Sequence, residues 1–73
     1  MNITLKQLTV FTATARLEGI TKAAQELCLT QSAASQSLKE LESILGYELF
    51  SRFGRKLAIN EQGKDLLNKA NQM

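Results

Sequence analysis

Residues 20–45, ITKAAQELCLTQSAASQSLKELESIL, contain two apolar patterns of helical period with only a few residues between them. The first pattern consists of Ala23, Ala24 and Leu27, and the second of Ala34, Leu38, Leu41 and Leu45. Thr30 can accept hydrogen bonds from the first free amides of a new helix, so the second helix is predicted to begin there. Two helices joined by so short a turn form a helix-turn-helix, which places its second helix in a DNA groove.

The second of these helices, residues 31–45, is predicted to have one packing face and one polar face. At about 100° per residue, the residues opposite its apolar stripe are Ser32, Ser35, Gln36, Lys39 and Ser43. The first two turns carry Gln and Ser and no charge before Lys39. Such hydrogen-bonding side chains suit base edges and phosphates, although a merely solvated face has a similar composition.

Composition restricts the kind of protein to which this motif can belong. The chain has 73 residues, a net charge of +2, one cysteine and no histidine, which indicates one small globular domain without an internal disulfide or His/Cys metal site. It has no glycine-rich phosphate loop and no nucleophile flanked by a base, so we expect neither an enzyme nor a cofactor. No apolar run approaches the roughly 18 residues of a membrane helix, so we expect a cytoplasmic protein without a membrane partner.

A helix is also predicted before the motif, over residues 5–17. Thr4 and Gln7 have the spacing of a capping box. The apolar stripe that follows consists of Leu5, Leu8, Phe11 and Ala15. Phe11 has the largest side chain of this stripe, and we expect it to anchor the core.

Turn residues separate the predicted elements. Gly19 and Gly46 follow helical stretches and suit the left-handed position that ends a helix. Gly54 lies between two short runs of strand-forming residues and marks a turn. Cys28, between two leucines at the end of the first motif helix, is predicted to be a small, half-buried filler, because a nearby acid does not favour a reactive thiolate.

Residues 47–59 are predicted to form a two-stranded hairpin, or wing. Strand-forming side chains flank a Phe-Gly-Arg turn, at Leu49, Phe50, Phe53, Leu57 and Ile59. Residues 1–46 hold four bases and four acids and residues 60–73 two of each, so the whole net charge lies in the wing. Its bases are Arg52, Arg55 and Lys56. A basic tip beside a helix-turn-helix suits phosphates or a narrow minor groove, and a solvated turn is the alternative.

Together these segments resemble the N-terminal winged helix-turn-helix of LysR-type transcriptional regulators. The resemblance covers nearly the whole chain and rests on the helix around Phe11, the AAQELCLTQSAAS core followed by LKELE, the GYELFSR entry to the wing, and the glycine-containing helix start at residues 60–63. It implies a mainly α fold with a small β-hairpin, made of a three-helix core, a two-stranded wing and a C-terminal linker helix. Residues 1–59 would form the DNA-binding domain, and residues 60–73 would begin the linker or dimerisation helix.

The resemblance implies a transcription regulator that binds partly palindromic double-stranded DNA as a dimer, or as a tetramer in the full-length protein. A small-molecule effector would bind a separate C-terminal domain that this chain lacks, and we expect the natural chain to continue. The linker helix would form a homodimer through Leu66, Leu67, Ala70 and Met73, or would instead dock back onto the first helix. A winged-helix protein-interaction module that does not bind DNA is the alternative function, but it should expose apolar side chains on the polar face described above.

The resemblance also assigns roles to individual positions. Base contacts fall on Gln31, Ser32, Ser35 and Gln36. Contacts with the DNA backbone or minor groove fall on Thr21, Thr30, Lys39, Arg52, Arg55 and Lys56. The threonines lie at helix N-termini and have capping as an alternative role, and Arg52 has a structural ion pair as its alternative. Many members have proline where Ser32 stands and arginine where Gln36 stands, so the bidentate arginine contact with guanine is missing and the sequence preference should differ.

Overall fold

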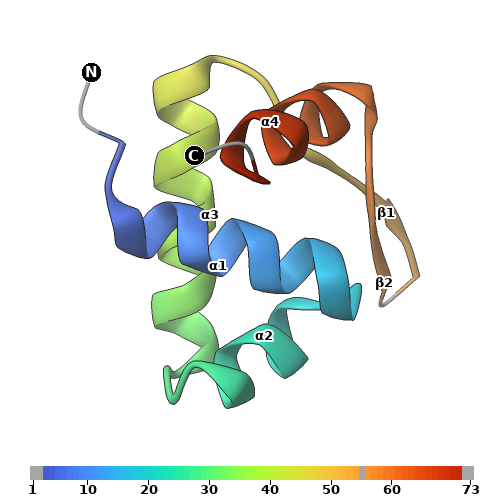
Figure 1. Cartoon of the computed structure of the whole chain (residues 1–73). Coiled ribbons are helices and arrows are strands. Elements are labelled where there is room, and N and C mark those ends of the chain that lie inside the picture. The colour runs from blue at the N-terminus through green and yellow to red at the C-terminus, as the bar shows by residue number, and fades with distance from the viewer. Residues whose placement is uncertain (1–2, 55, 72–73) are drawn as a thin grey trace.

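The computed structural model of the chain describes residues 3–54 and 56–71. Three helices come first, and they are α1 (Leu5–Leu17), α2 (Ile20–Glu26) and α3 (Gln31–Leu45) (Figure 1). The antiparallel strands β1 (Phe50–Phe53) and β2 (Lys56–Ile59) follow, and α4 (Glu61–Asn71) comes last. The predicted fold class is therefore confirmed: a helical core, a two-stranded wing and a further helix.

Helix α1 begins as predicted, but it buries a different face. The Thr4 hydroxyl accepts a hydrogen bond from the Gln7 amide at 3.1 Å, and the Gln7 side chain accepts one from the Thr4 amide at 3.0 Å. Leu5 is 80% exposed, so its place in the predicted apolar stripe was wrong. The buried residues of α1 are Gln7, Val10, Phe11, Ala13 and Thr14. Thr14 can be buried because its hydroxyl donates to the Val10 carbonyl at 2.7 Å and leaves no polar group without a partner.

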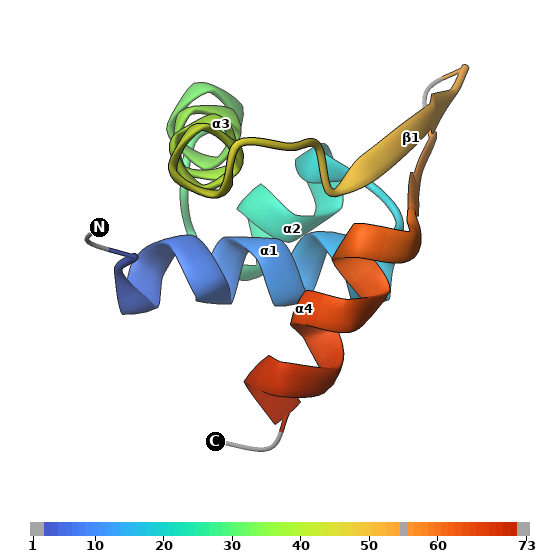
Figure 2. The ribbon, with the colours of Figure 1, turned by 90° about the horizontal axis from the view of Figure 1, so that it is seen from above.

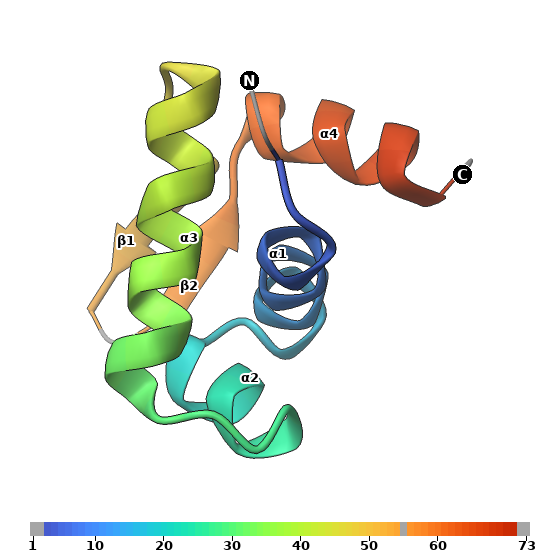
Figure 3. The same ribbon diagram turned by 90° about the vertical axis from the view of Figure 1, so that its left-hand side faces the viewer.

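The helix-turn-helix has the predicted construction. Ala23 and Ala24 are buried, and their small side chains let α2 lie close to its neighbours. Thr30 caps α3 and accepts a hydrogen bond from the Ala33 amide at 3.1 Å. Figure 3 shows α3 upright while α1 is seen end-on, so the two helices cross steeply.

One predicted turn residue, Gly19, and the cysteine Cys28 behave differently from expectation. Gly46 takes the predicted left-handed position with φ 83°, and Gly54, at the predicted turn, has φ 62°. Gly19 is extended with φ −175° and precedes α2, whereas Glu18 takes the left-handed position with φ 57°. Cys28 is also left-handed, with φ 58°, and it is exposed rather than half-buried. The tight reversal between α2 and α3 requires this conformation, and Leu27 and Leu29 supply the apolar contacts instead.

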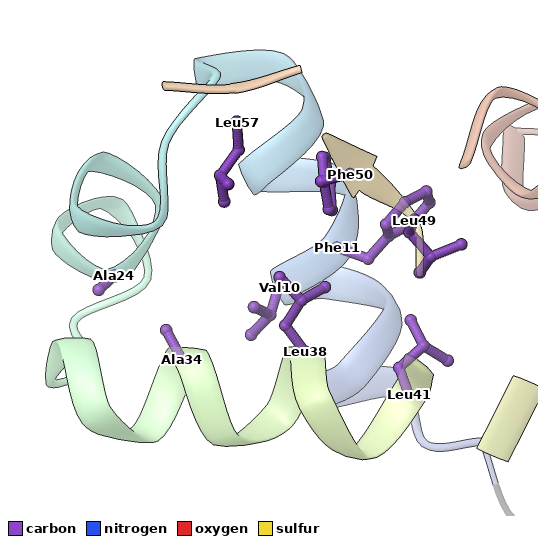
Figure 4. Close-up of a cluster of buried hydrophobic side chains, with 9 residues drawn as sticks. All are labelled: Val10, Phe11, Ala24, Ala34, Leu38, Leu41, Leu49, Phe50 and Leu57. Atoms are coloured by element: carbon purple, nitrogen blue, oxygen red, sulfur yellow. The ribbon is translucent and has the colours of Figure 1, made fainter. Parts of the chain in front are cut away.

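The wing is fixed to the helices at its base. Phe11 is fully buried and its ring lies 5.7 Å from that of Phe50 at a 55° tilt, so its predicted role as core anchor is confirmed. Figure 4 shows this cluster of buried side chains, to which Leu49 and Leu57 contribute beside the residues of α1 and α3. The wing base therefore belongs to the hydrophobic core, while the tip extends beyond it.

The last helix lies on the opposite side of the molecule from α3. In Figure 2, α3 and the far end of the wing are on one side of α1, and α4 is on the other. Leu66 and Leu67 are half-buried and pack against the core, so α4 docks in part onto its own domain. No helix among the described residues is long and apolar enough to cross a membrane.

Candidate nucleic-acid interface

Helix α3 turns a continuous polar face to solvent, which we call the recognition face. It consists of Gln31, Ser32, Ser35, Gln36 and Lys39. All are exposed except Ser35, which is half-buried. None of these side chains takes part in a hydrogen bond or ion pair between described residues. Their donors and acceptors are therefore available to a partner in solution.

The two threonines predicted to contact phosphate are in different situations. The Thr30 oxygen accepts the capping bond of α3, and the residue is exposed, so its hydroxyl proton can still be donated. Thr21 is exposed in the first turn of α2, and no side chain caps that helix. The structure thus confirms the capping role of Thr30, while the phosphate contacts of both residues stay predictions.

The wing carries its cations at the exposed end. Arg52 in β1 and Lys56 at the start of β2 are both exposed, and Arg55 lies outside the described residues. None of the ion pairs between described residues includes Arg52, so the alternative structural role finds no support there. Both described cations are free to meet an anionic partner.

The recognition face and the wing border the same open groove. From α3 it is lined by Gln31, Ser35 and Lys39, from the wing by Arg52, Gly54 and Lys56, and from α2 by Thr21, Lys22 and Gln25. Ser32 and Gln36 lie farther round α3, outside this groove. The structure therefore brings most of the predicted DNA contacts together on one side of the molecule.

Lys22 and Gln25 were missed by the sequence prediction. Both are exposed on α2 and line the groove. A signal was available, because the first helix of a helix-turn-helix crosses the DNA backbone and a lysine in its first turns suits a phosphate. The lining cations are Lys22, Lys39, Arg52 and Lys56, against the carboxylates of Glu18, Glu42 and Glu48. The described part of the groove is thus only weakly cationic.

A set of contacts that we call the wing seam holds the wing against α3 and α4. Glu42 of α3 accepts a hydrogen bond from the Leu49 amide at 2.8 Å. Asn60 donates from its side chain to the Glu48 carbonyl at 2.8 Å and from its amide to the Leu49 carbonyl at 3.0 Å. Its side-chain oxygen accepts from the Gly63 amide at 2.8 Å, which caps α4. These bonds fix the direction in which the wing leaves the core.

Gly63 and Glu18 complete the seam. A Cβ at Gly63 would lie 2.4 Å from the Leu49 carbonyl oxygen and 2.5 Å from a side-chain carbon of Ile59, so only glycine fits. The Glu18 carbonyl accepts from the Leu57 amide at 3.3 Å, which joins the α1–α2 turn to β2. From the sequence, Gly63 was predicted only as part of a helix start, and no role was predicted for Glu42 or Asn60.

Comparison with known proteins gives the family. Residues 5–64 match the family model described as bacterial regulatory helix-turn-helix protein, lysR family. The chain is 45% identical over 67 residues to the HTH-type transcriptional activator CmpR of Synechocystis sp. and 40% identical over 68 residues to the RuBisCO operon transcriptional regulator of Allochromatium vinosum. These matches cover 92% and 93% of this chain but 22% of each relative, so the chain spans about a fifth of their length.

Two similar solved structures are complexes with DNA. The CbnR_DBD-DNA complex matches with a TM-score of 0.87 and 28% identity, and the match covers 99% of this chain and 80% of that one. DarR of Vibrio fischeri in complex with DNA matches with a TM-score of 0.91 and 29% identity, over 99% of this chain and 25% of that one. The chain therefore belongs to the LysR family of bacterial regulatory helix-turn-helix proteins, as a winged helix-turn-helix DNA-binding domain and not an enzyme.

Proposed function

We propose that the chain binds double-stranded DNA with α3 in the major groove and the wing on the adjoining backbone and minor groove. The observation that carries this proposal is the shared groove, where free polar side chains of α3 face the free cations of the wing. The major groove is wide enough to admit an α-helix, and side chains without a hydrogen-bond partner can bond to the base edges there. The basic hairpin beside it reaches the phosphates that flank this groove.

The recognition face supports a preference for adenine. Gln31 and Gln36 are both exposed, and a glutamine side chain can donate to N7 and accept from N6 of adenine in a bidentate pair. No arginine stands on this face, and its one cation is Lys39. We therefore assign base readout to the glutamines together with Ser32 and Ser35, and backbone contacts to Thr21, Thr30 and Lys39.

The first test is a fluorescence-anisotropy titration of the chain with mixed-sequence duplex DNA at several salt concentrations. We expect the affinity to fall as salt rises, because phosphate contacts release counterions. Arg52→Ala and Lys56→Ala should each flatten the salt slope by about one unit, while Gln36→Ala should leave it unchanged. Absence of binding even at low salt would contradict the proposal and favour the protein-interaction module.

The base preference has a test of its own. Gln36→Arg should shift the selected base at one position of each half-site from adenine to guanine, with roughly 1–3 kcal/mol of discrimination, because arginine pairs bidentately with guanine. Selection from a randomised duplex pool measures this change. Ser43→Arg is the matched control, because it adds the same charge to an exposed position near the other end of α3. If Ser43→Arg changed the selected base in the same way as Gln36→Arg, added charge alone would explain the change, and base readout by Gln36 would be contradicted.

We further propose that α4 mediates a homodimer, which supports binding to two half-sites. The helix lies opposite the recognition face, so a second copy on α4 leaves α3 and the wing free (Figure 2). Leu66 and Leu67 are only half-buried by their own domain, and Ala70 is half-buried near the end of the helix. Met73 lies outside the described residues. A further domain would be required for assembly into a tetramer and for response to a small molecule in the cytoplasm. The relatives are long enough to contain such a domain.

Sedimentation analysis of single substitutions tests the dimer. Ala70→Asp should shift the chain towards monomer, and Asn68→Asp, which adds the same charge at an exposed position of the same helix, should not. These two are preferable to Leu66→Asp, because Leu66 also packs against the core and its loss would lower the stability of the monomer. Equal oligomeric states of both variants and the wild type would contradict the assignment.

A further inference from the structure

One large apolar side chain stands within the proposed DNA-binding surface. Phe53, the last residue of β1, is 66% exposed, whereas the other two phenylalanines of the chain, Phe11 and Phe50, are buried in the core. Gly54 follows it with φ 62° and makes the turn, so the turn itself does not require an aromatic residue at position 53. Isolated apolar residues on a surface are common. Phe53 is notable because it lies among side chains proposed to bind DNA.

Strand pairing defines the face of the wing on which Phe53 lies. Arg52 pairs with Leu57, and Phe53 pairs with Lys56. Because successive side chains of a strand point to opposite faces, Phe53 and Lys56 share one face, and Arg52 is on the other. Arg52 lines the groove shared with α3, and Phe53 does not. At the end of the wing, Arg52 and Lys56 therefore both border the groove shared with α3, whereas Phe53 lies on the outer face beside its cross-strand neighbour Lys56.

We propose that Phe53 packs against the deoxyribose wall of the minor groove when the wing binds DNA. This inference rests on the proposed mode of binding, in which Arg52 and Lys56 bring the wing to the phosphates. A hairpin that enters a minor groove meets a wall on each face. Sugar C–H groups line these walls, and apolar side chains are commonly placed in minor grooves. Phe53 meets the wall away from α3, and Lys56, its cross-strand neighbour, binds an adjacent phosphate.

The contact has a distinct physical signature. Phosphate contacts weaken steeply as salt rises, because they depend on the release of counterions. Burial of an aromatic ring removes apolar surface from water and releases no counterion, so its contribution is nearly independent of salt. The net charge of the chain is only +2, which limits its electrostatic attraction to DNA. Phe53 thus contributes binding free energy that persists at high salt, where the contribution of the cations is small.

Salt-dependent titration of the whole chain with mixed-sequence duplex DNA separates the two contributions. Phe53→Ala should weaken binding by about tenfold at both low and high salt, so that its log–log plot runs parallel to that of the wild type. Phe53→Leu should recover most of the loss because it restores apolar area. Ser51→Ala, on the same outer face of β1, is the control and should bind like the wild type. Unchanged affinity of Phe53→Ala, or a flattened salt slope, would overturn the inference.

A second measurement places the side chain directly. The chain has no tryptophan, so Phe53→Trp introduces a single reporter. We expect its emission to shift to the blue and its quenching by acrylamide to fall when duplex DNA is added. Leu5→Trp, at the strongly exposed start of α1, should show neither change. If anisotropy reports binding while the emission of Phe53→Trp stays constant, the inference fails alone. If the wild type does not bind DNA, the proposed function fails as well.

Discussion

The wing seam and the recognition face are both rich in polar groups, but they use them in opposite ways. In the seam, the side chains of Glu42 and Asn60 are engaged in hydrogen bonds with backbone groups of another segment. On the recognition face, the side chains of Gln31, Ser32 and Gln36 have no partner among the described residues. The difference separates two tasks, because the seam positions the wing and the recognition face remains available for DNA.

This separation matters in a chain of 73 residues. A domain of that size buries only roughly 60% of the surface of its unfolded chain and has a small margin of stability. Groups left unpaired on the recognition face are tolerated because they are exposed to water. Within the described residues, no buried side-chain nitrogen or oxygen lacks a hydrogen-bond partner. Substitutions in the seam should therefore reduce stability, and substitutions on the recognition face should change only DNA binding.

The largest effect should come from Gly63→Ala. The added carbon would collide with the Leu49 carbonyl and Ile59, so we expect the free energy of unfolding to fall by roughly 1–3 kcal/mol or more. Urea denaturation followed by circular dichroism measures this loss. Gly19→Ala is the matched control, because nothing lies within 4 Å of a Cβ there and its backbone is extended. Equal stability of the two variants would show that the seam can relax around the extra carbon.

Glu42→Ala should have the next largest effect. The change leaves the Leu49 amide without its acceptor, and an unpaired, partly buried donor costs about 1–3 kcal/mol. Glu42→Gln should retain much of the stability because its amide oxygen can still accept. Glu40→Ala, which alters an exposed carboxylate on the same helix, should change stability by less than about 0.5 kcal/mol. If Glu42→Ala and Glu40→Ala unfolded at the same urea concentration, the assigned role of Glu42 would be wrong.

Glu18 belongs to the seam and also borders the groove, and its substitution should give the smallest effect. Its carbonyl is part of the seam, its exposed side chain lines the groove, and its φ of 57° is unfavourable for a residue with a side chain. Glu18→Gly should raise the free energy of unfolding by about 0.5–1 kcal/mol, because relief of strain outweighs the entropy of the more flexible unfolded chain.

Glu18→Gln separates strain from charge. This variant keeps the strained backbone and should not alter stability, yet both variants should bind DNA somewhat more tightly because a carboxylate near phosphates is removed. Thermal unfolding and anisotropy on the same samples supply both quantities. A stabilising effect of Glu18→Gln comparable to that of Glu18→Gly would contradict the strain argument.

The parts of the fold that were predicted correctly depend on local signals. The capping box of Thr4 and Gln7, the start of α3 at Thr30 and the left-handed Gly46 each follow from residues close in sequence. The errors concern burial and turn geometry that helical periodicity alone does not determine. Leu5 fits the helical period but is 80% exposed, whereas Thr14 can be buried because its hydroxyl is satisfied within the helix.

In the candidate site, too, some features could be predicted from the sequence and others could not. The recognition face could be identified because one helix carries it and its period is visible in the sequence. The groove could not, because it forms only where α2, α3 and the wing meet in space, and Lys22 was missed although its place in the first helix of the motif suits a backbone contact. The seam was also invisible, since Glu42 and Leu49 are seven residues apart and Asn60 reaches back twelve residues to Glu48.

The attachment of α4 through Asn60 also has a mechanical consequence. Two hydrogen bonds join this residue to the backbone that enters the wing, and the close packing at Gly63 leaves no room for the helix to pivot. Helix α4 is thus held rigidly on the side of the molecule away from the recognition face and is not a flexible tether. In a dimer formed through α4, the two recognition helices would be held at a fixed separation and angle. The contacts of Asn60 would then determine which spacing of operator half-sites the dimer can bind.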